Sequence, residues 1–209
     1  MEIKVEAQAE RLVQPEWATL ELDISCEGTD RQAVMETVRS LSVELADTVP
    51  NLVPHAVSKW SLSPVRVHSW TTGRRGGILR CAASARARLT FLDLTALGDF
   101  CQHWGQYEHV ELLPVEWELS PPTQATVEEE LLVEAVEKTR RRAAVLARAA
   151  GAELTDCTHL SDNWDSLPVH RDSGPLAASL RSRKSADSAP VLPDDLRLTV
   201  TVHAQYAAD

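Results

Sequence analysis

Residues 126–151 read TVEEELLVEAVEKTRRRAAVLARAAG, and this stretch predicts a long amphipathic helix. Thr126 and Glu129 have the spacing of a capping box, in which each side chain satisfies a backbone N–H at the start of a helix. Gly151 can adopt the left-handed conformation that ends a helix. Small and apolar residues recur on one face: Leu132, Ala135, Val136, Thr139, Ala143, Leu146, Ala147 and Ala150. Because this face is rich in alanine, the helix can approach a β-sheet closely.

The rest of the chain supplies strands for that helix to cover. Apolar residues alternate with polar ones over 3–9, 18–26, 79–91, 115–119 and 196–206, which is typical of strands with one face in water. We interpret the first two segments as an antiparallel pair. Short strands interrupted at Pro64 are expected between Val57 and Trp70, and a weaker strand is expected over 154–160.

Two further helices and two loops complete the expected elements. Thr29 or Asp30 can cap a helix that stops before Pro50, and Asp93 can cap a shorter helix. The glycines of 73–77 predict a hairpin turn, and the Ser-, Asp- and Pro-rich segment 165–193 is interpreted as a mobile surface loop. We therefore predict an α+β fold in which helices, the longest at 126–151, pack on one side of an antiparallel sheet. A doubly wound nucleotide-binding fold is less favoured, since its parallel strands are usually apolar throughout.

The composition limits the classes of function. The chain has 209 residues, a formal net charge of −10 and a sequence pI of about 5.2, which argues against nucleic-acid binding. No apolar run approaches the roughly 20 residues that cross a bilayer, so no membrane insertion is expected. The N-terminal residues alternate like a strand and lack the features of a signal peptide, which predicts a cytoplasmic protein. The four cysteines form no CxxC motif, and Cys26 and Cys81 fall in the apolar phase of strands.

Several strings, in this order, resemble the SIMPL domain family. They are ATLELDI at 18–24, WSLSP at 60–64, VEWELS at 115–120 and, most strongly, the helix that runs from AVEKTR at 135–140 to Gly151. The closing strand at 198–206 also fits, so we expect a single SIMPL-like domain over 1–209. The resemblance implies an α+β fold, self-assembly in at least some members, mostly bacterial occurrence and no established enzymatic activity. It carries nothing over to 165–193, which matches the family poorly.

Two groups of residues are of types that could form chemical sites, although no catalytic constellation is recognisable and no cofactor is expected. Cys101, His103 and His109 are of types that bind metals, but packing and surface roles are favoured because Cys101 falls on the apolar face of its helix. His159 lies between Asp156 and Asp162, which could suggest acid–base work or a cation site. Acidic residues at the edges of a weak strand are more often solvated.

The expected hairpin carries the possible interface residues Trp70, Arg74 and Arg75. Trp70 lies on the polar phase of its strand, and exposed tryptophan is enriched at binding hot spots. The GRRGG turn could hold an anion through its backbone N–H groups, but it lacks the strand-to-helix context of a phosphate loop, so a plain exposed hairpin is favoured. The basic run at 138–142 is interpreted as a solvated helix face that could also meet an acidic neighbour across a subunit interface.

Two hypotheses of function follow. The first is a non-enzymatic binding or scaffold protein of the SIMPL family that forms homo-oligomers or binds a protein partner, with sheet edges and the hairpin as contact elements. The second is an unrecognised enzyme or small-ligand-binding protein with a pocket between sheet and helices.

Overall fold

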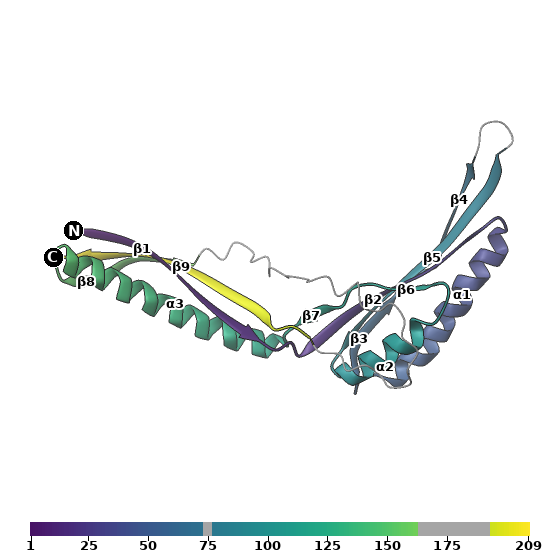
Figure 1. Ribbon diagram of the computed structural model, residues 1–209, viewed down its shortest axis with the longest axis horizontal. Helices are drawn as coiled ribbons and strands as arrows, with labels where there is room; N and C mark the ends of the chain where they lie inside the picture. The colour runs from purple at the N-terminus through teal and green to yellow at the C-terminus, as the bar shows by residue number, and fades with distance from the viewer. Residues whose placement is uncertain (73–76, 163–192) are drawn as a thin grey trace. The chain divides into compact units, whose positions relative to one another are not determined.

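The structure is a computed structural model that describes residues 1–72, 77–162 and 193–209. These residues form two compact units, a larger one built mainly from Glu16–Glu118 and a smaller one built from 1–15, 119–162 and 194–209. Each unit has its own antiparallel sheet covered by helices, which confirms the predicted α+β class (Figure 1).

The smaller unit is a three-stranded sheet covered by one long helix. Its strands are β1 (Glu2–Val13), β8 (Leu154–Asp162) and β9 (Leu196–Ala208), in the order β1-β9-β8. The β1/β9 register runs without a break from Glu2↔Ala207 to Val13↔Leu196. The helix α3 (Pro121–Ala149) lies along the sheet and packs against β1 and β9 (Figure 1).

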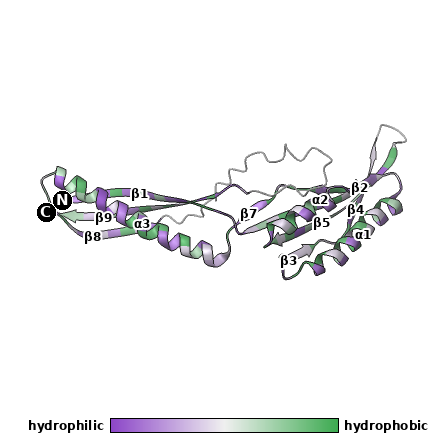
Figure 2. Ribbon diagram, turned by 60° about the horizontal axis from the view of Figure 1, so that its bottom comes forward, coloured by the Kyte–Doolittle hydropathy of each residue, from purple (hydrophilic) through white to green (hydrophobic). Residues whose placement is uncertain are grey.

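Small residues let α3 approach this sheet closely. Its buried positions recur at four-residue steps: Val127, Leu131, Ala135, Thr139, Ala143 and Ala147. The sheet presents alternate residues of β1 and β9 to this face, and both strands change between hydrophilic and hydrophobic along their length (Figure 2). Thr139 is fully buried there, and its hydroxyl lies 3.0 Å from that of Tyr206.

The larger unit has six strands and two α-helices. The strands are β2 (Trp17–Gly28), β3 (Val57–Leu62), β4 (Arg66–Thr72), β5 (Ile78–Phe91), β6 (Val110–Leu112) and β7 (Glu116–Glu118). The main path is β3-β5-β2-β6, with β4 paired to β5 and β7 paired to β2. The helices are α1 (Arg31–Thr48), which is followed by the 3₁₀ turn η1 (Val49–Asn51), and α2 (Leu94–Trp104). Both helices contact β2 and β5, and the unit's core is made of the buried residues of these elements.

Three local signals for helix ends are confirmed. Asp30 caps α1 by accepting a hydrogen bond from the backbone N–H of Gln32 at 2.8 Å, and Asp93 caps α2 in the same way. Gly151 has a φ of 76°, as expected for the residue that ends a long helix. The broken strands around Pro64 and the strands β5, β8 and β9 also lie where the sequence predicts them.

Two predictions are wrong. Segments 3–9 and 18–26 do not pair with each other, since β1 pairs with β9 and β2 pairs with β5, β6 and β7. The long helix begins at Pro121 with Ser120 as its cap, so Thr126 lies inside it and donates its hydroxyl to the carbonyl of Pro122. Proline is well tolerated in the first helical turn because the N–H that it lacks would be unpaired there.

Other expectations are met in part or fall outside the described residues. The strand expected over 115–119 is limited to Glu116–Glu118. Two residues of the predicted helix face, Leu146 and Ala150, are exposed. The hairpin residues 73–76 and almost all of the segment 165–193 lie outside the described residues.

Candidate interaction surface

The β4–β5 ribbon, which we define as Arg66–Thr72 with the facing residues 78–84, extends past the neighbouring strand. Its register runs from Arg66↔Ser84 to Thr72↔Ile78. The pairing of β2 with β5 ends at Gly28↔Cys81. The ribbon therefore continues beyond β2 for three described residues of β5, 78–80 (Figure 1).

The base of the ribbon is anchored to the larger unit. Ser69 accepts a hydrogen bond from Nη1 of Arg31, the first residue of α1, at 3.1 Å. Val67 packs against the core, and the buried Cys81 places its sulfur 3.4 Å from the carbonyl oxygen of Gly28. Val67 and Ser69 are two residues apart on β4 and so share a face, and Cys81 of β5 lies opposite Ser69 on that same face, which contacts α1.

The opposite face carries Trp70. Its ring stacks on that of His68, with the centroids 5.1 Å apart and the planes at 22°. Trp70 is half-buried as a result, and Arg80 lies directly opposite it in the register. Its role as an interface anchor stays a prediction, and Arg74 and Arg75 lie outside the described residues.

Apolar side chains are exposed where the ribbon runs past β2. Ile78 is 61% exposed and Leu79 is 53% exposed, and they lie on opposite faces of β5. Figure 2 shows this end of β5 as hydrophobic. A two-stranded ribbon with apolar side chains on both faces exposes a surface that a partner could cover.

The outer edge of β4 presents backbone hydrogen-bonding groups. The backbone of Arg86 points toward the β3/β4 side of β5, because its C=O accepts from the N–H of Ser63 and its N–H donates to the Ser63 hydroxyl, both at 2.8 Å. Backbone groups alternate in direction along a strand, so the even-numbered residues of β5 bond to the even-numbered residues of β4. The N–H and C=O groups of Val67, Ser69 and Thr71 therefore point away from β5.

The ribbon also lies within the cationic part of an acidic chain. Residues 48–92 contain seven of the 21 basic residues and none of the 31 acidic ones. The remaining 14 basic residues stand against all 31 acidic residues, which gives a net charge of −17 outside this segment. Arg86 and Arg88 form ion pairs with Asp23, Glu21 and Glu116, whereas Arg66 and Arg80 form none with any described residue. The ribbon thus presents uncompensated positive charge.

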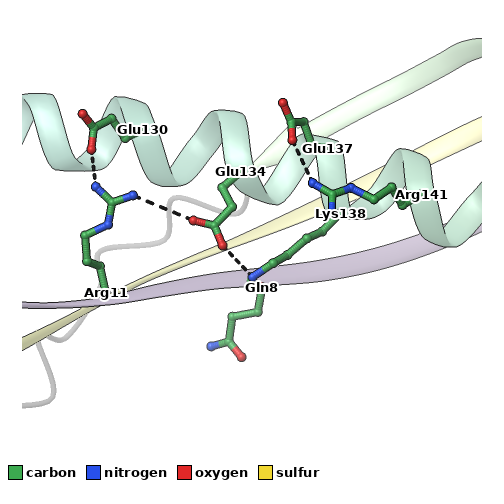
Figure 3. A network of polar contacts seen from close by, with 7 residues as sticks. All are labelled: Gln8, Arg11, Glu130, Glu134, Glu137, Lys138 and Arg141. Carbon is green, nitrogen blue, oxygen red and sulfur yellow. Dashed lines mark hydrogen bonds and ion pairs between the residues drawn. The ribbon is translucent and has the colours of Figure 1, made fainter.

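In the smaller unit, side chains of α3 cover backbone carbonyls along the edge of β1. Lys138 donates to the backbone carbonyl of Gln8 at 3.2 Å, and Arg142 donates to that of Glu6 at 3.0 Å. Figure 3 shows how Glu134 holds Lys138, at 2.8 Å, and also faces Arg11. The hydrogen bond from Lys138 lowers the pKa of Glu134.

Part of the basic run at 138–142 is therefore not simply solvated. Two of its members cover backbone acceptors of an edge strand that would otherwise be open to a second chain. Contact of this run with an acidic neighbour across an interface stays a prediction.

The residues weighed as metal ligands have packing contacts. Burial raises the pKa of the Cys101 thiol to about 11, which disfavours the thiolate that a metal binds. His103 meets the rings of Trp104 and Tyr107 edge-on. Within 1–72, 77–162 and 193–209, no three His, Cys, Asp or Glu side chains are grouped so that they could hold a metal ion.

Two open depressions lie on the surface of the described residues. One, of about 560 Å³, lies between α1 and residues 107–109 of the segment before β6 and includes His109. Beside it, Tyr107 donates a hydrogen bond to Glu44 of α1, which raises the pKa of the tyrosine. The other, of about 340 Å³, brings His159 to Lys4, Glu6 and His203 on the sheet of the smaller unit; Asp156 and Asp162 do not line it.

Fold and surface together define an α+β protein whose most distinctive feature is a cationic β-ribbon. The chain belongs to the SIMPL family, which is described as proteins of unknown function (DUF541), and the family's sequence model matches residues 3–206. The match spans both units. No curated protein matches the chain. The described helices include none with the length and apolar character needed to span a membrane.

Sequence reasoning missed the charge segregation of this surface. We considered the net charge of the whole chain, which hides a cationic segment inside an acidic sequence. Counting charges in windows of 40–50 residues would have found it. The anchoring of Ser69 by Arg31 had no comparable signal, because the two residues are 38 positions apart.

Proposed function

We propose that the chain is a non-enzymatic binding or scaffold protein that acts through the β4–β5 ribbon, by self-assembly or by binding a protein partner. The observation that carries the proposal is a combination on one projecting element: Arg66 and Arg80, which form no ion pair with a described residue, and the exposed Ile78 and Leu79. Charged groups steer association and apolar groups supply most of the affinity once surfaces meet.

The charge of the ribbon selects an acidic partner surface. A second copy of the chain offers one, since the sequence outside 48–92 carries a net charge of −17. Self-assembly of this kind joins unlike surfaces of two copies and is weakened by salt, because ions screen exposed charges over about 8 Å at physiological ionic strength.

The mass of the protein in solution tests the proposal. Light scattering over a wide concentration range should show a mass that rises with concentration at low salt and falls in 0.5 M salt. The double variant Arg66→Glu with Arg80→Glu should stay monomeric under the same conditions. The matched control changes two exposed arginines outside the ribbon and outside the basic run at 138–142, Arg39 and Arg148, to glutamate and should assemble like the wild type. A wild-type monomer at every concentration, with no partner captured from the source cell, would contradict the proposal.

The depression beside Tyr107 supports a second candidate, a small-ligand-binding protein or an enzyme. A raised tyrosine pKa next to a cavity is a feature that ligand sites share. Thermal-shift screening of the wild type and of Tyr107→Phe tests this candidate. A compound that stabilises the wild type and not the variant would favour it over the scaffold proposal.

A further inference from the structure

We infer that the outer edge of β4 binds an extended acidic segment of a partner protein as an added antiparallel strand. This inference rests on the proposed function, since it specifies how the β4–β5 ribbon makes its contact. The first step is the backbone: Val67, Ser69 and Thr71 direct their N–H and C=O groups away from β5, and an added strand would pair with them.

The second step is the side chains beside that edge. Arg66 and Arg80 lie on the same face of the ribbon as Trp70, and neither forms an ion pair with a described residue. Arg31 reaches the other face at Ser69. An added strand places alternate side chains on each face of the sheet, so acidic residues at alternate positions would lie beside Arg66, with Arg80 one strand further in, opposite Trp70.

The third step concerns the source of the strand. Edge strands of a second copy fit this edge poorly, and pairing with its β4 would bring two cationic ribbons together. Its β1 edge has two carbonyls occupied by Lys138 and Arg142. Its β8 edge shifts register twice against β9, between Leu154 and His159, and bulges of this kind disturb pairing. An extended segment that orders on binding has neither obstacle.

Strand addition differs from general attraction between charges in one testable way, because it needs backbone N–H groups on both sides. The probe is a fluorescein-labelled ten-residue peptide in which glutamate alternates with threonine or valine. A matched peptide keeps the five glutamates and has proline in place of threonine or valine, because these residues would bond to Val67, Ser69 and Thr71 when the glutamates lie on the face of Arg66. Fluorescence anisotropy measures the binding of each to the full chain.

We expect the alternating peptide to bind at least ten-fold more tightly than the proline peptide. Ser69→Pro removes an outward N–H without removing a bond to β5, and should weaken binding of the alternating peptide by about ten-fold. Ser69→Ala loses the hydroxyl and its contact with Arg31 in the same way but keeps the N–H, so it should bind the peptide about ten-fold more tightly than Ser69→Pro. Circular dichroism and thermal unfolding verify that both variants are folded. If Ser69→Pro does not fold, the comparison of the two peptides on the wild type tests strand addition by itself.

The outcomes separate this inference from the function on which it rests. Equal binding of the two peptides, or equal binding by Ser69→Pro and Ser69→Ala, would overturn strand addition. If Arg66→Glu with Arg80→Glu still abolished self-assembly in that case, the scaffold function would stand, with a second folded copy as the partner. If neither peptide bound and the chain stayed monomeric without any partner, both would be rejected.

Discussion

Replacing Thr139 by valine should destabilise the smaller unit by about 1–3 kcal/mol, although valine has almost the same shape. Thr139 is fully buried, and Tyr206 is 4% exposed. The Thr139 hydroxyl donates to the carbonyl of Val136 at 2.7 Å, so its single proton is used, and the Tyr206 hydroxyl 3.0 Å away must be the donor between the two. Valine leaves that tyrosine hydroxyl buried without an acceptor.

Removing the hydroxyl of Tyr206 instead should destabilise the smaller unit less. Tyr206→Phe removes the donor, but Thr139 keeps its bond to Val136, so the loss is limited to one net hydrogen bond of about 0.5–1.5 kcal/mol. Combining the two changes removes the unpaired hydroxyl that Thr139→Val creates. The double variant should therefore be less destabilised than the sum of the single variants, and also less than Thr139→Val alone.

Urea unfolding followed by circular dichroism at 222 nm measures these free energies, since α3 has 29 residues and dominates the helix signal of the smaller unit. Thr126→Val, at an exposed position of the same helix, is the matched control and should change the free energy of unfolding by no more than about 0.5 kcal/mol. A cost for the double variant equal to the sum of the single costs would refute the reasoning, because it would mean that the two hydroxyls are independent.

Three further predictions concern other parts of the chain. At pH 8, iodoacetamide should label the exposed Cys157 well before Cys101, because a pKa of about 11 keeps the Cys101 thiol protonated. Peptide mass mapping measures the order of labelling, and labelling of Cys101 first would contradict its burial. Alanine at both Lys138 and Arg142 uncovers two carbonyls of β1 and should promote salt-insensitive aggregation in light scattering, an effect that arginine at Lys138 should not produce. The pKa of Tyr107 should lie above that of an ordinary tyrosine, because its hydrogen bond to the Glu44 carboxylate of α1 favours the neutral form. The difference in absorbance between the wild type and Tyr107→Phe, followed against pH, measures this pKa. That stabilisation is complete below the unfolded tyrosine pKa and is lost as pH rises through the folded one, so a shift to lower pKa would contradict the contact.

The local elements of the fold could be predicted from the sequence, but their pairing could not. Alternation and capping depend on neighbouring residues, which is why Asp30, Asp93 and Gly151 mark helix ends correctly. Strand partners depend on the whole fold. β1 and β2 are adjacent in the sequence and both alternate, yet the partner of β1 is β9, which begins at Leu196, 183 residues after β1 ends at Val13. The three-residue strand β6 is too short to show any period.

The start of α3 shows a different limit. A capping box at Thr126 and Glu129 is a valid local signal, but the helix begins at Pro121, and a pair of prolines is equally typical of the end of an extended segment. Proline fits both roles, because its fixed φ suits the first turn of a helix as well as an extended segment. Trp70 was correctly placed on the polar phase of its strand, but its stacking on His68 depends on side-chain conformation and has no sequence pattern of its own.

The pairing of β1 with β9 also sets an order of events during synthesis. Residues 16–118 hold the main core of the larger unit, and their ends are joined by a hydrogen bond from the Glu16 N–H to the Glu118 carbonyl, at 3.0 Å. They can fold as soon as they leave the ribosome, since domains fold as units from the N-terminal side. β1 is made before the larger unit, yet it must wait for β9, which follows that unit, before its backbone is paired. A chain stopped before residue 196 would therefore carry a finished larger unit together with two unpaired strands, β1 and β8, and a helix whose sheet lacks its central strand.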